Sequence, residues 1–158
     1  VKIMTMEHVK AVISLAASMS GDQDSGMGLV KDAVSKADLG LTTPTGAKFY
    51  HDDREIGTAE EYTLGSGSDC PDAFGNDQAF SRLHVLYIKN KTGSDLTIGA
   101  GAKPVLLTGT AGSETIILPT GCTFLYINPT GLTLEAGVSD DLKLAGTGGE
   151  VDIIIIGA

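Results

Sequence analysis

From residue 83 to residue 156 the chain alternates short apolar runs with turns rich in Gly, Pro, Asn and Asp. Runs of this length, rich in β-branched residues and closed by turn residues, are typical of β-strands. A spacing of roughly 8–12 residues between such runs favours a β-sandwich, a jelly roll or a small barrel. The predicted strands in this region are residues 83–89, 95–99, 104–108, 114–119, 122–127, 132–136, 141–145 and 150–156.

The segment before this region predicts two more strands and a long loop. Residues 47–50 are expected to start the sheet, a turn follows at His51–Asp53, and residues 60–64 form the second strand. Residues 65–77 are rich in Gly, Ser and Asp and predict a polar loop. A loop of this length inside a compact domain is usually functional or mobile.

Two turns share the pattern Asn-x-Thr-Gly, at Asn90–Gly93 and at Asn128–Gly131. Each follows a strongly apolar strand and precedes a strand with period-two alternation. This arrangement predicts two equivalent hairpins, as in a double-sheet roll.

The last run, residues 151–156, ends in four consecutive Ile. An unbroken apolar strand is normally covered on both faces, and at a bare sheet edge it would favour aggregation. We therefore expect a central strand, or an edge strand covered by the N-terminal region or by a neighbouring subunit. Ile153 and Ile155 are our candidate interface residues in this strand.

Residues 1–46 precede the β domain, residues 47–158, and predict a helical or extended N-terminal arm. Apolar residues recur with helical spacing over residues 5–19, and a second, weaker helix is expected over residues 29–39. A helix of about fifteen residues is marginal by itself in water, so its apolar stripe requires a partner, either the β domain or another subunit. This stripe is a candidate interface and consists of Met6, Val9, Ile13 and Ala16.

The net charge of −9 and the sequence pI near 4.6 bear on the class of partner. A strongly acidic chain is repelled by the phosphates of nucleic acids and by anionic membranes, so we expect neither as a partner. No apolar run approaches the roughly 18 residues of a membrane-spanning helix. Lys10 and Ser14 interrupt the apolar stretch near the N-terminus, so we expect no signal peptide and assembly in a cytoplasm.

The two cysteines are Cys70 and Cys122, and neither belongs to a C-x-x-C pair. We expect two free thiols, with Cys122 buried in a strand and Cys70 in a loop. A disulfide between them is the alternative, and it requires the loop around Cys70 to fold over the strand at residues 122–127. The spacing gives no support for a zinc site or for thioredoxin-type chemistry.

Side chains that could carry chemistry are few, and those present have simpler interpretations. His51–Glu55 could form a metal or acid–base cluster, but adjacent residues of an extended chain point to opposite sides, so a solvated turn is favoured. Asp69, Asp72 and Asp77 offer oxygen ligands for Ca²⁺, but their spacing is not that of an EF-hand loop, so an Asp-rich loop is favoured. We therefore expect no catalytic residues, no metal, no cofactor and no enzymatic activity.

Several segments in the last two thirds of the chain are generic one by one, but their order along the chain is informative. They are Thr58–Gly65, Asp72–Gly75, Phe80–Asn90, Leu96–Gly99, Leu118–Leu125, Asn128–Gly131 and Val151–Gly157. In this order they resemble a group of small virion structural proteins of tailed bacteriophages. The likeness covers about residues 58–158, and residues 1–57 do not share it.

The resemblance implies a non-enzymatic β-sandwich displayed on a phage capsid, neck or tail, in a virion assembled in the host cytoplasm. Our first hypothesis is a capsid decoration (cement) protein that binds the major capsid protein or other virion proteins. It would form a homo-oligomer such as a trimer and grip the shell with its N-terminal arm through many weak repeated contacts. A neck or tail component is the second hypothesis. A receptor- or glycan-binding module that uses the loop at residues 65–77 is the third.

Overall fold

The computed structural model describes residues 12–15, 35–38, 48–66, 69–72, 74–99, 101–107 and 115–158. The chain divides into two compact units, Met6–Thr43 and a larger one formed by Val1–Thr5 with Pro44–Ala158. In the smaller unit, β1 (Val12–Leu15) and β2 (Ser35–Asp38) pair as antiparallel strands.

These two strands lie where the sequence pattern predicts helices. Val12–Leu15 falls inside the expected helix 5–19, and Ser35–Asp38 falls inside the expected helix 29–39. Val12 and Ile13 are β-branched and favour strands, and Ile13 lies opposite Ala37 in the antiparallel register. The other predicted residues of the apolar stripe, Met6, Val9 and Ala16, lie outside the described residues.

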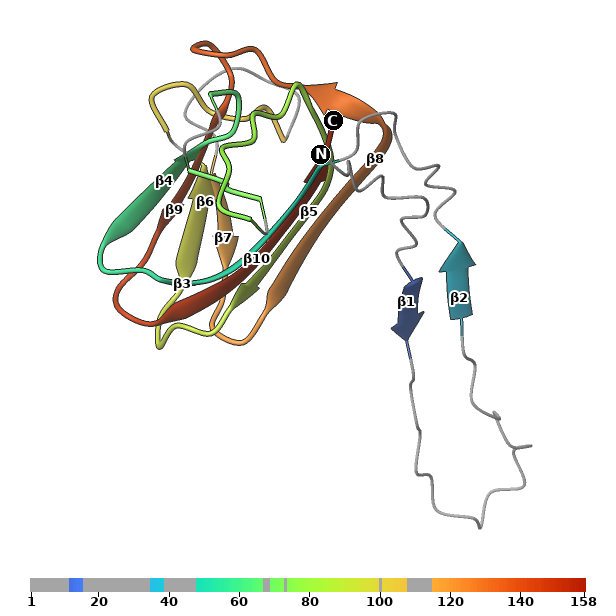
Figure 1. Cartoon of the computed structure of the whole chain (residues 1–158). Helices are drawn as coiled ribbons and strands as arrows, with labels where there is room; N and C mark the ends of the chain where they lie inside the picture. The colour runs from blue at the N-terminus through green and yellow to red at the C-terminus, as the bar shows by residue number, and fades with distance from the viewer. Residues whose placement is uncertain are drawn as a thin grey trace, which may run out of the picture. The chain divides into compact units, whose positions relative to one another are not determined.

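The larger unit contains two four-stranded sheets in which all neighbouring strands are antiparallel (Figure 1). The first sheet has the order β3 (Lys48–Glu55), β10 (Glu150–Gly157), β5 (Arg82–Asn90) and β8 (Thr123–Thr133). The second sheet has the order β4 (Ala59–Thr63), β9 (Asp141–Ala145), β6 (Leu96–Gly99) and β7 (Thr115–Leu118). The prediction of a mainly β, antiparallel domain is confirmed.

The pairings follow a simple rule along the chain. β3 pairs with β10, β4 with β9, β5 with β8, and β6 with β7. These are the pairs of one long two-stranded ribbon whose two legs are β3–β6 and β7–β10. Additional pairing of β10 with β5 and of β9 with β6 joins successive parts of the ribbon into the two sheets.

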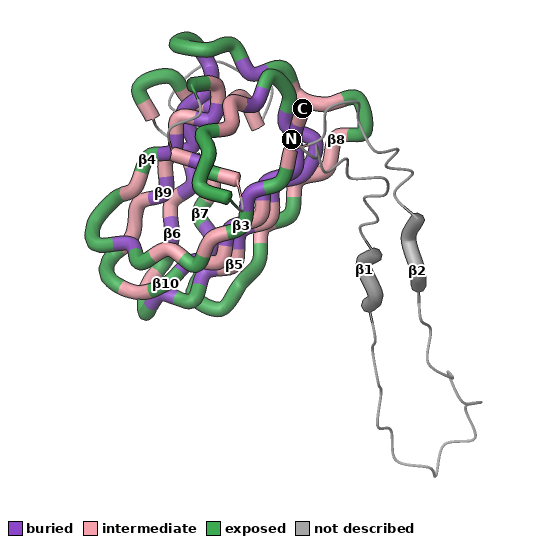
Figure 2. Tube along the Cα trace, in the orientation of Figure 1, coloured by how far each residue is buried: buried purple, intermediate pink, exposed green. Residues whose placement is uncertain are grey.

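Buried residues alternate with more exposed ones along several strands of both sheets (Figure 2), and the buried apolar residues of both sheets form one shared core. β10 is an inner strand of the first sheet, as predicted. Full burial of each large apolar side chain contributes roughly 1.5–3 kcal/mol, so this core is the main stabilising element of the unit. The largest fully buried side chains are Tyr62, Phe80, Ile56, Leu64, Leu83, Leu86, Ile88, Leu96, Ile98, Leu142, Leu144 and Ile153.

The two Asn-x-Thr-Gly segments do not form the predicted hairpins. Asn90–Gly93 carries the chain from β5 in the first sheet to β6 in the second. Asn128–Gly131 lies within β8 as a wide bulge, because Val85 pairs with Ile127 while Leu83 pairs with Leu132. Four residues of β8 therefore stand opposite the single residue His84.

Other boundaries also differ from the sequence prediction. His51–Asp53 lies in the middle of β3 rather than in a turn, because its partner β10 is long enough to pair along the whole segment. Residues 104–107 lie outside the strands, and Pro104 makes only an isolated bridge to Asp141. Residues 132–133 end β8, so the predicted strand 132–136 is not a separate element.

Candidate docking surface

The outward side of the first sheet carries two rows of mainly apolar side chains, with one residue from each strand in each row. Tyr50, Leu86 and Ile155 point into the core, and because successive residues of a strand alternate between faces, their neighbours point outward. The register aligns the outward residues as Phe49–Ile156–Val85–Ile127 and as His51–Ile154–Tyr87–Leu125. We call the apolar members of these rows the apolar band: Phe49, Ile156, Val85, Ile127, Ile154, Tyr87 and Leu125.

Exposure within the apolar band increases toward the sheet edges. Phe49 on β3 is 46% exposed and Leu125 on β8 is 38% exposed. Val85 and Ile156, on the two inner strands, are nearly buried. Strands are spaced about 4.8 Å apart and alternate residues about 7 Å apart, so two rows across four strands cover on the order of 270 Å². This footprint is smaller than the roughly 300–600 Å² of the largest apolar patch on a typical monomer, so the band alone can form only part of an interface.

A charged row borders the apolar band. Asp53, Asp152 and Lys89 follow the second apolar row in the same register, and Glu55 lies opposite Glu150 one row further on. Lys91 forms an ion pair with Asp53 at 3.4 Å and another with Asp152. The hydrogen bond to Asp152 raises the pKa of Lys91. Four carboxylates and two ammonium groups therefore give this border a net negative charge.

The outward side of the second sheet has a different character. Ala59, Ala145, Thr97 and Ile117 form one row across its four strands. Ile117, on the edge strand β7, is 64% exposed, and the other residues of the row are small. The two faces of the larger unit thus differ, and the apolar surface is concentrated on the first sheet.

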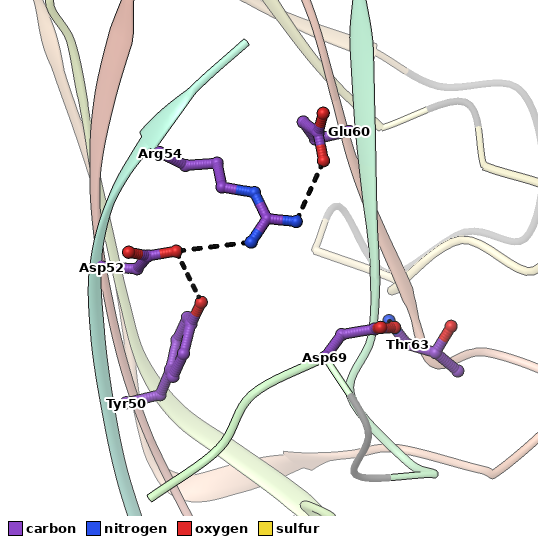
Figure 3. A network of polar contacts seen from close by, with 6 residues as sticks. All are labelled: Tyr50, Asp52, Arg54, Glu60, Thr63 and Asp69. Carbon is purple, nitrogen blue, oxygen red and sulfur yellow. Dashed lines mark hydrogen bonds and ion pairs between the residues drawn. The ribbon is translucent and has the colours of Figure 1, made fainter. Parts of the chain in front are cut away.

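A polar cluster connects the edge strands β3 and β4, which belong to different sheets (Figure 3). The Tyr50 hydroxyl donates a hydrogen bond to Asp52 Oδ2 at 2.9 Å. Arg54 Nη1 lies 3.6 Å from the same oxygen, and Arg54 Nη2 donates to Glu60 Oε2 at 3.1 Å. One guanidinium thus bridges carboxylates of both sheets.

Aromatic rings form the inner side of this polar cluster. Arg54 Cζ lies 5.4 Å from the centroid of the Tyr62 ring, and the rings of Tyr50 and Tyr62 meet edge to face at 6.2 Å. Burial raises the pKa of both tyrosines, so both hydroxyls stay protonated at neutral pH. The cluster therefore acts as a polar closure of the sheet edges rather than as a source of a base or nucleophile.

The candidate interface residues predicted on β10 are on the wrong face. Ile153 and Ile155 have no exposed surface and belong to the core. Their neighbours Ile154 and Ile156 point outward into the apolar band. Four consecutive isoleucines hide which face of the strand each residue occupies. Asp152 could have shown it, because a carboxylate favours the outer face and residues two and four positions along a strand, Ile154 and Ile156, lie on the same face.

The acidic residues that the sequence suggests as possible metal ligands make different contacts and do not form one site. Asp52 points into the polar cluster, whereas Asp53 belongs to the charged row on the opposite face. Asp69 Oδ2 accepts a hydrogen bond from the Thr63 amide at 2.8 Å, and Asp72 accepts hydrogen bonds within its own loop. Within the described residues no three or more His, Cys, Asp and Glu side chains are grouped as a metal site.

The cysteines have exchanged the environments that the sequence suggests. Both thiols are free, as expected, but Cys70 is buried and Cys122 is exposed. Burial raises the pKa of Cys70 to about 12, so its thiol is protonated and unreactive at neutral pH. Cys122 lies just before β8, in the turn where its amide donates to Pro119 O at 3.0 Å.

The chain matches no protein-family model, no curated protein and no solved structure. In the described part of the chain, no helix has the length and apolar character needed to cross a bilayer. The apolar band crosses all four strands of the first sheet, is most exposed at Phe49 and Leu125 on the two edge strands, and is bordered by charge.

Proposed function

We propose that this protein is a non-enzymatic structural protein of a bacteriophage virion, and specifically a capsid decoration protein that binds the major capsid protein. The observation that carries this proposal is the apolar band on the outward side of the first sheet. Contiguous exposed apolar surface with a polar rim is the usual mark of a protein–protein contact. A repeated lattice multiplies the gain from each modest contact, so a small band is sufficient for occupancy of a shell.

The strand order supports the same proposal. A two-stranded ribbon wrapped into two four-stranded sheets is the arrangement of an eight-stranded jelly roll, so the strand order supports a sandwich of this type. Jelly rolls are common among viral capsid proteins and also among lectins. Since one fold hosts many functions, the apolar band and not the topology decides between these classes. A glycan platform uses exposed aromatic residues together with polar groups, whereas the band is mainly aliphatic.

The first test is the number of copies per particle. Quantitative mass spectrometry of purified virions should give on the order of hundreds of copies, as a contact repeated over a lattice requires. About a dozen copies or fewer would point instead to a ring in the neck or tail. Absence from virions would refute the structural role. Sedimentation of the free protein would test the homo-oligomer, with a trimer as the expected state.

The second test addresses the apolar band itself. Tyr87→Ser combined with Leu125→Ser should weaken binding to shells stripped of this protein by at least about tenfold, because two apolar contacts are lost. Ile117→Ser, a matched change on the outward side of the second sheet, should leave binding unchanged. Both variants should unfold at nearly the wild-type denaturant concentration, since all three residues lie outside the core. Equal binding by both variants would contradict the proposal.

A further inference from the structure

The loop between β4 and β5 is held in one conformation at its base. The Phe80 amide donates to Leu64 O at 2.8 Å, which closes the loop where it leaves and rejoins the sheets. Cys70, within the same loop, is fully buried. Asp69 Oδ2 accepts a hydrogen bond from the Thr63 amide at 2.8 Å, which fixes the start of the loop to β4 (Figure 3).

The outer part of this loop is a compact turn organised by Asp72. Pro71 and Asp77 form a backbone bridge, and Asp72 Oδ1 accepts hydrogen bonds from the amides of Phe74 and Asn76, both at 2.8 Å. Gly75 has φ +81°, a conformation that favours glycine, and its amide donates to Asp72 O at 2.9 Å. The described residues of the turn are therefore held to one another by hydrogen bonds within the chain itself.

This turn presents Phe74 to solvent. Phe74 is 76% exposed, which is the highest value among the exposed large hydrophobic residues in the described part of the chain. A single exposed hydrophobic residue is common on protein surfaces, so the exposure of Phe74 counts together with the hydrogen bonds that hold its turn. The same arrangement favours binding, because little conformational entropy is lost when the ring enters a pocket.

The turn lies beside the apolar band. Gln78 Nε2 donates to Phe49 O at 2.8 Å and to Pro71 O at 3.4 Å, so it ties the turn to the first residue of the apolar band. The band covers on the order of 270 Å², well below the roughly 800 Å² per partner of a standard interface. A full interface therefore needs further contacts, and the turn that is tied to Phe49 through Gln78 offers Phe74 as one of them.

Charge around Phe74 specifies the partner. The charged residues between positions 65 and 79 are Asp69, Asp72 and Asp77, and the whole chain carries a net charge of −9. A second copy that met this loop with its own loop would bring like charges together, which disfavours that pairing. A pocket with a rim of Lys or Arg would be attracted.

We propose that Phe74 is a preformed aromatic anchor that enters an apolar pocket rimmed by Lys or Arg on the protein that covers the apolar band. This inference rests on the proposed function for the identity of that protein. Anchors of this type dominate interfaces because a central, fully desolvated side chain contributes more than its share of the contact area. The acidic residues around Phe74 add attraction at long range, which raises the association rate at low salt.

The test uses the full chain and shells purified from particles that lack this protein. Phe74→Ala should weaken binding by at least about tenfold, mainly through faster dissociation. Asp77→Asn should slow association by a few fold and reduce its dependence on salt, because one exposed charge is lost. Ile117→Ala, a matched loss of an exposed apolar side chain on the other sheet, should bind within about twofold of wild type.

One result would overturn the anchor while leaving the proposed function intact: binding to shells by Phe74→Ala that equals the binding by Ile117→Ala and by wild type. Failure of the wild-type protein to bind shells would refute the proposed function instead. In that case a cross-linking measurement tests separately whether Phe74 contacts another virion protein.

For that measurement, p-benzoylphenylalanine is placed at position 74 or, as the control, at position 117 of the full chain in infected cells. Mass spectrometry identifies the cross-linked peptides. Cross-links from position 74 to one virion protein, at apolar residues flanked by Lys or Arg, support the anchor whichever virion protein carries them. Cross-links to a second copy of this chain, or no more cross-linking than from position 117, overturn it.

Discussion

At the scale of single residues, the surroundings of a side chain decide its chemistry in this protein. Cys70 sits in a stretch of polar residues, yet it is buried because the loop folds inward around it. Cys122 sits at the start of an apolar run, yet it is exposed in the turn before β8. The neighbouring residues in sequence could not predict either environment, since each depends on contacts with residues far along the chain.

The two thiols should therefore differ strongly in reactivity. With a pKa of about 12, only on the order of one Cys70 side chain in ten thousand is ionised at pH 8, and the buried sulfur is also shielded from reagents. Iodoacetamide at pH 8 should alkylate Cys122 at least about a hundredfold faster than Cys70. Peptide mass spectrometry over time measures both rates. Comparable rates in the folded protein would show that Cys70 is accessible; in denaturant, the two rates should converge.

Asp72 should make the turn that carries Phe74 sensitive to acid. Hydrogen bonds from the Asn76 side chain, with those from nearby amides, lower the pKa of Asp72. Since the folded pKa lies below the ordinary value of about 3.9, the stabilisation is complete above that value and is lost as pH falls through the folded pKa. The turn should thus persist at pH 5–8, roughly, and open below about pH 4.

An NMR titration of the Asp72 carboxyl and of the Phe74 and Asn76 amides measures this transition. The three groups should titrate together, with a midpoint below the ordinary value. Asp72→Asn, which keeps an acceptor oxygen without the ionisable group, should abolish the common transition. A midpoint at or above about 3.9 would show that the hydrogen bonds do not favour the carboxylate.

At the scale of secondary-structure elements, strand positions were easier to predict than strand connections. Apolar runs bounded by turn residues located β5, β6, β9 and β10 to within a residue or two, because each strand owes its pattern to burial against one core. Of the two Asn-x-Thr-Gly segments, Asn90–Gly93 connects two strands but forms no hairpin, and Asn128–Gly131 lies within β8. A local motif does not specify which sheet the next strand joins.

The reason lies in what the asparagines do. Asn90 Oδ1 accepts hydrogen bonds from the Thr92 amide and hydroxyl at 2.9 and 2.7 Å. Asn128 Oδ1 accepts the equivalent hydrogen bonds from Thr130 at 3.1 and 2.8 Å. The same local turn serves as a crossing between sheets in one case and as a bulge in the other, so long-range pairing makes the difference.

Alternation along β10 leads to a prediction about its isoleucines. Ile153→Ala should lower the free energy of unfolding by about 2–5 kcal/mol, because it leaves a cavity in the core. Ile154→Ala, the same change one residue along, should cost less than about 1 kcal/mol, because Ile154 faces outward and is partly exposed. Urea denaturation of both variants measures the difference. A larger cost at Ile154 would mean that the register of β10 is shifted by one residue.

At the scale of the whole molecule, the fold class followed from the sequence but the candidate interface did not. The mainly β, antiparallel architecture follows from many short apolar runs, which tolerate errors in any one of them. A surface contact depends on which face of each strand is turned outward, so a shift of one residue moves it into the core, as at Ile153 and Ile155. Phe74 gave no periodic signal at all, because its exposure comes from one tight turn.

Removal of residues 1–43 tests how much this part of the chain contributes to the stability of the larger unit and to binding. Every residue of the core in the described part of the chain lies between Tyr50 and Ile155, so a chain that begins at Pro44 should keep its cooperative unfolding transition and nearly the full-length denaturant midpoint. Under the proposed function it should still bind shells through the apolar band, but more weakly than the full chain, because we expect the N-terminal arm to add a second contact. Denaturation curves and shell-binding isotherms for the two chains measure both effects. Binding equal to that of the full chain would show that the N-terminal arm is not part of the contact. Complete loss of binding would show that the apolar band does not bind shells by itself. A non-cooperative unfolding transition would show that the core needs residues before Pro44.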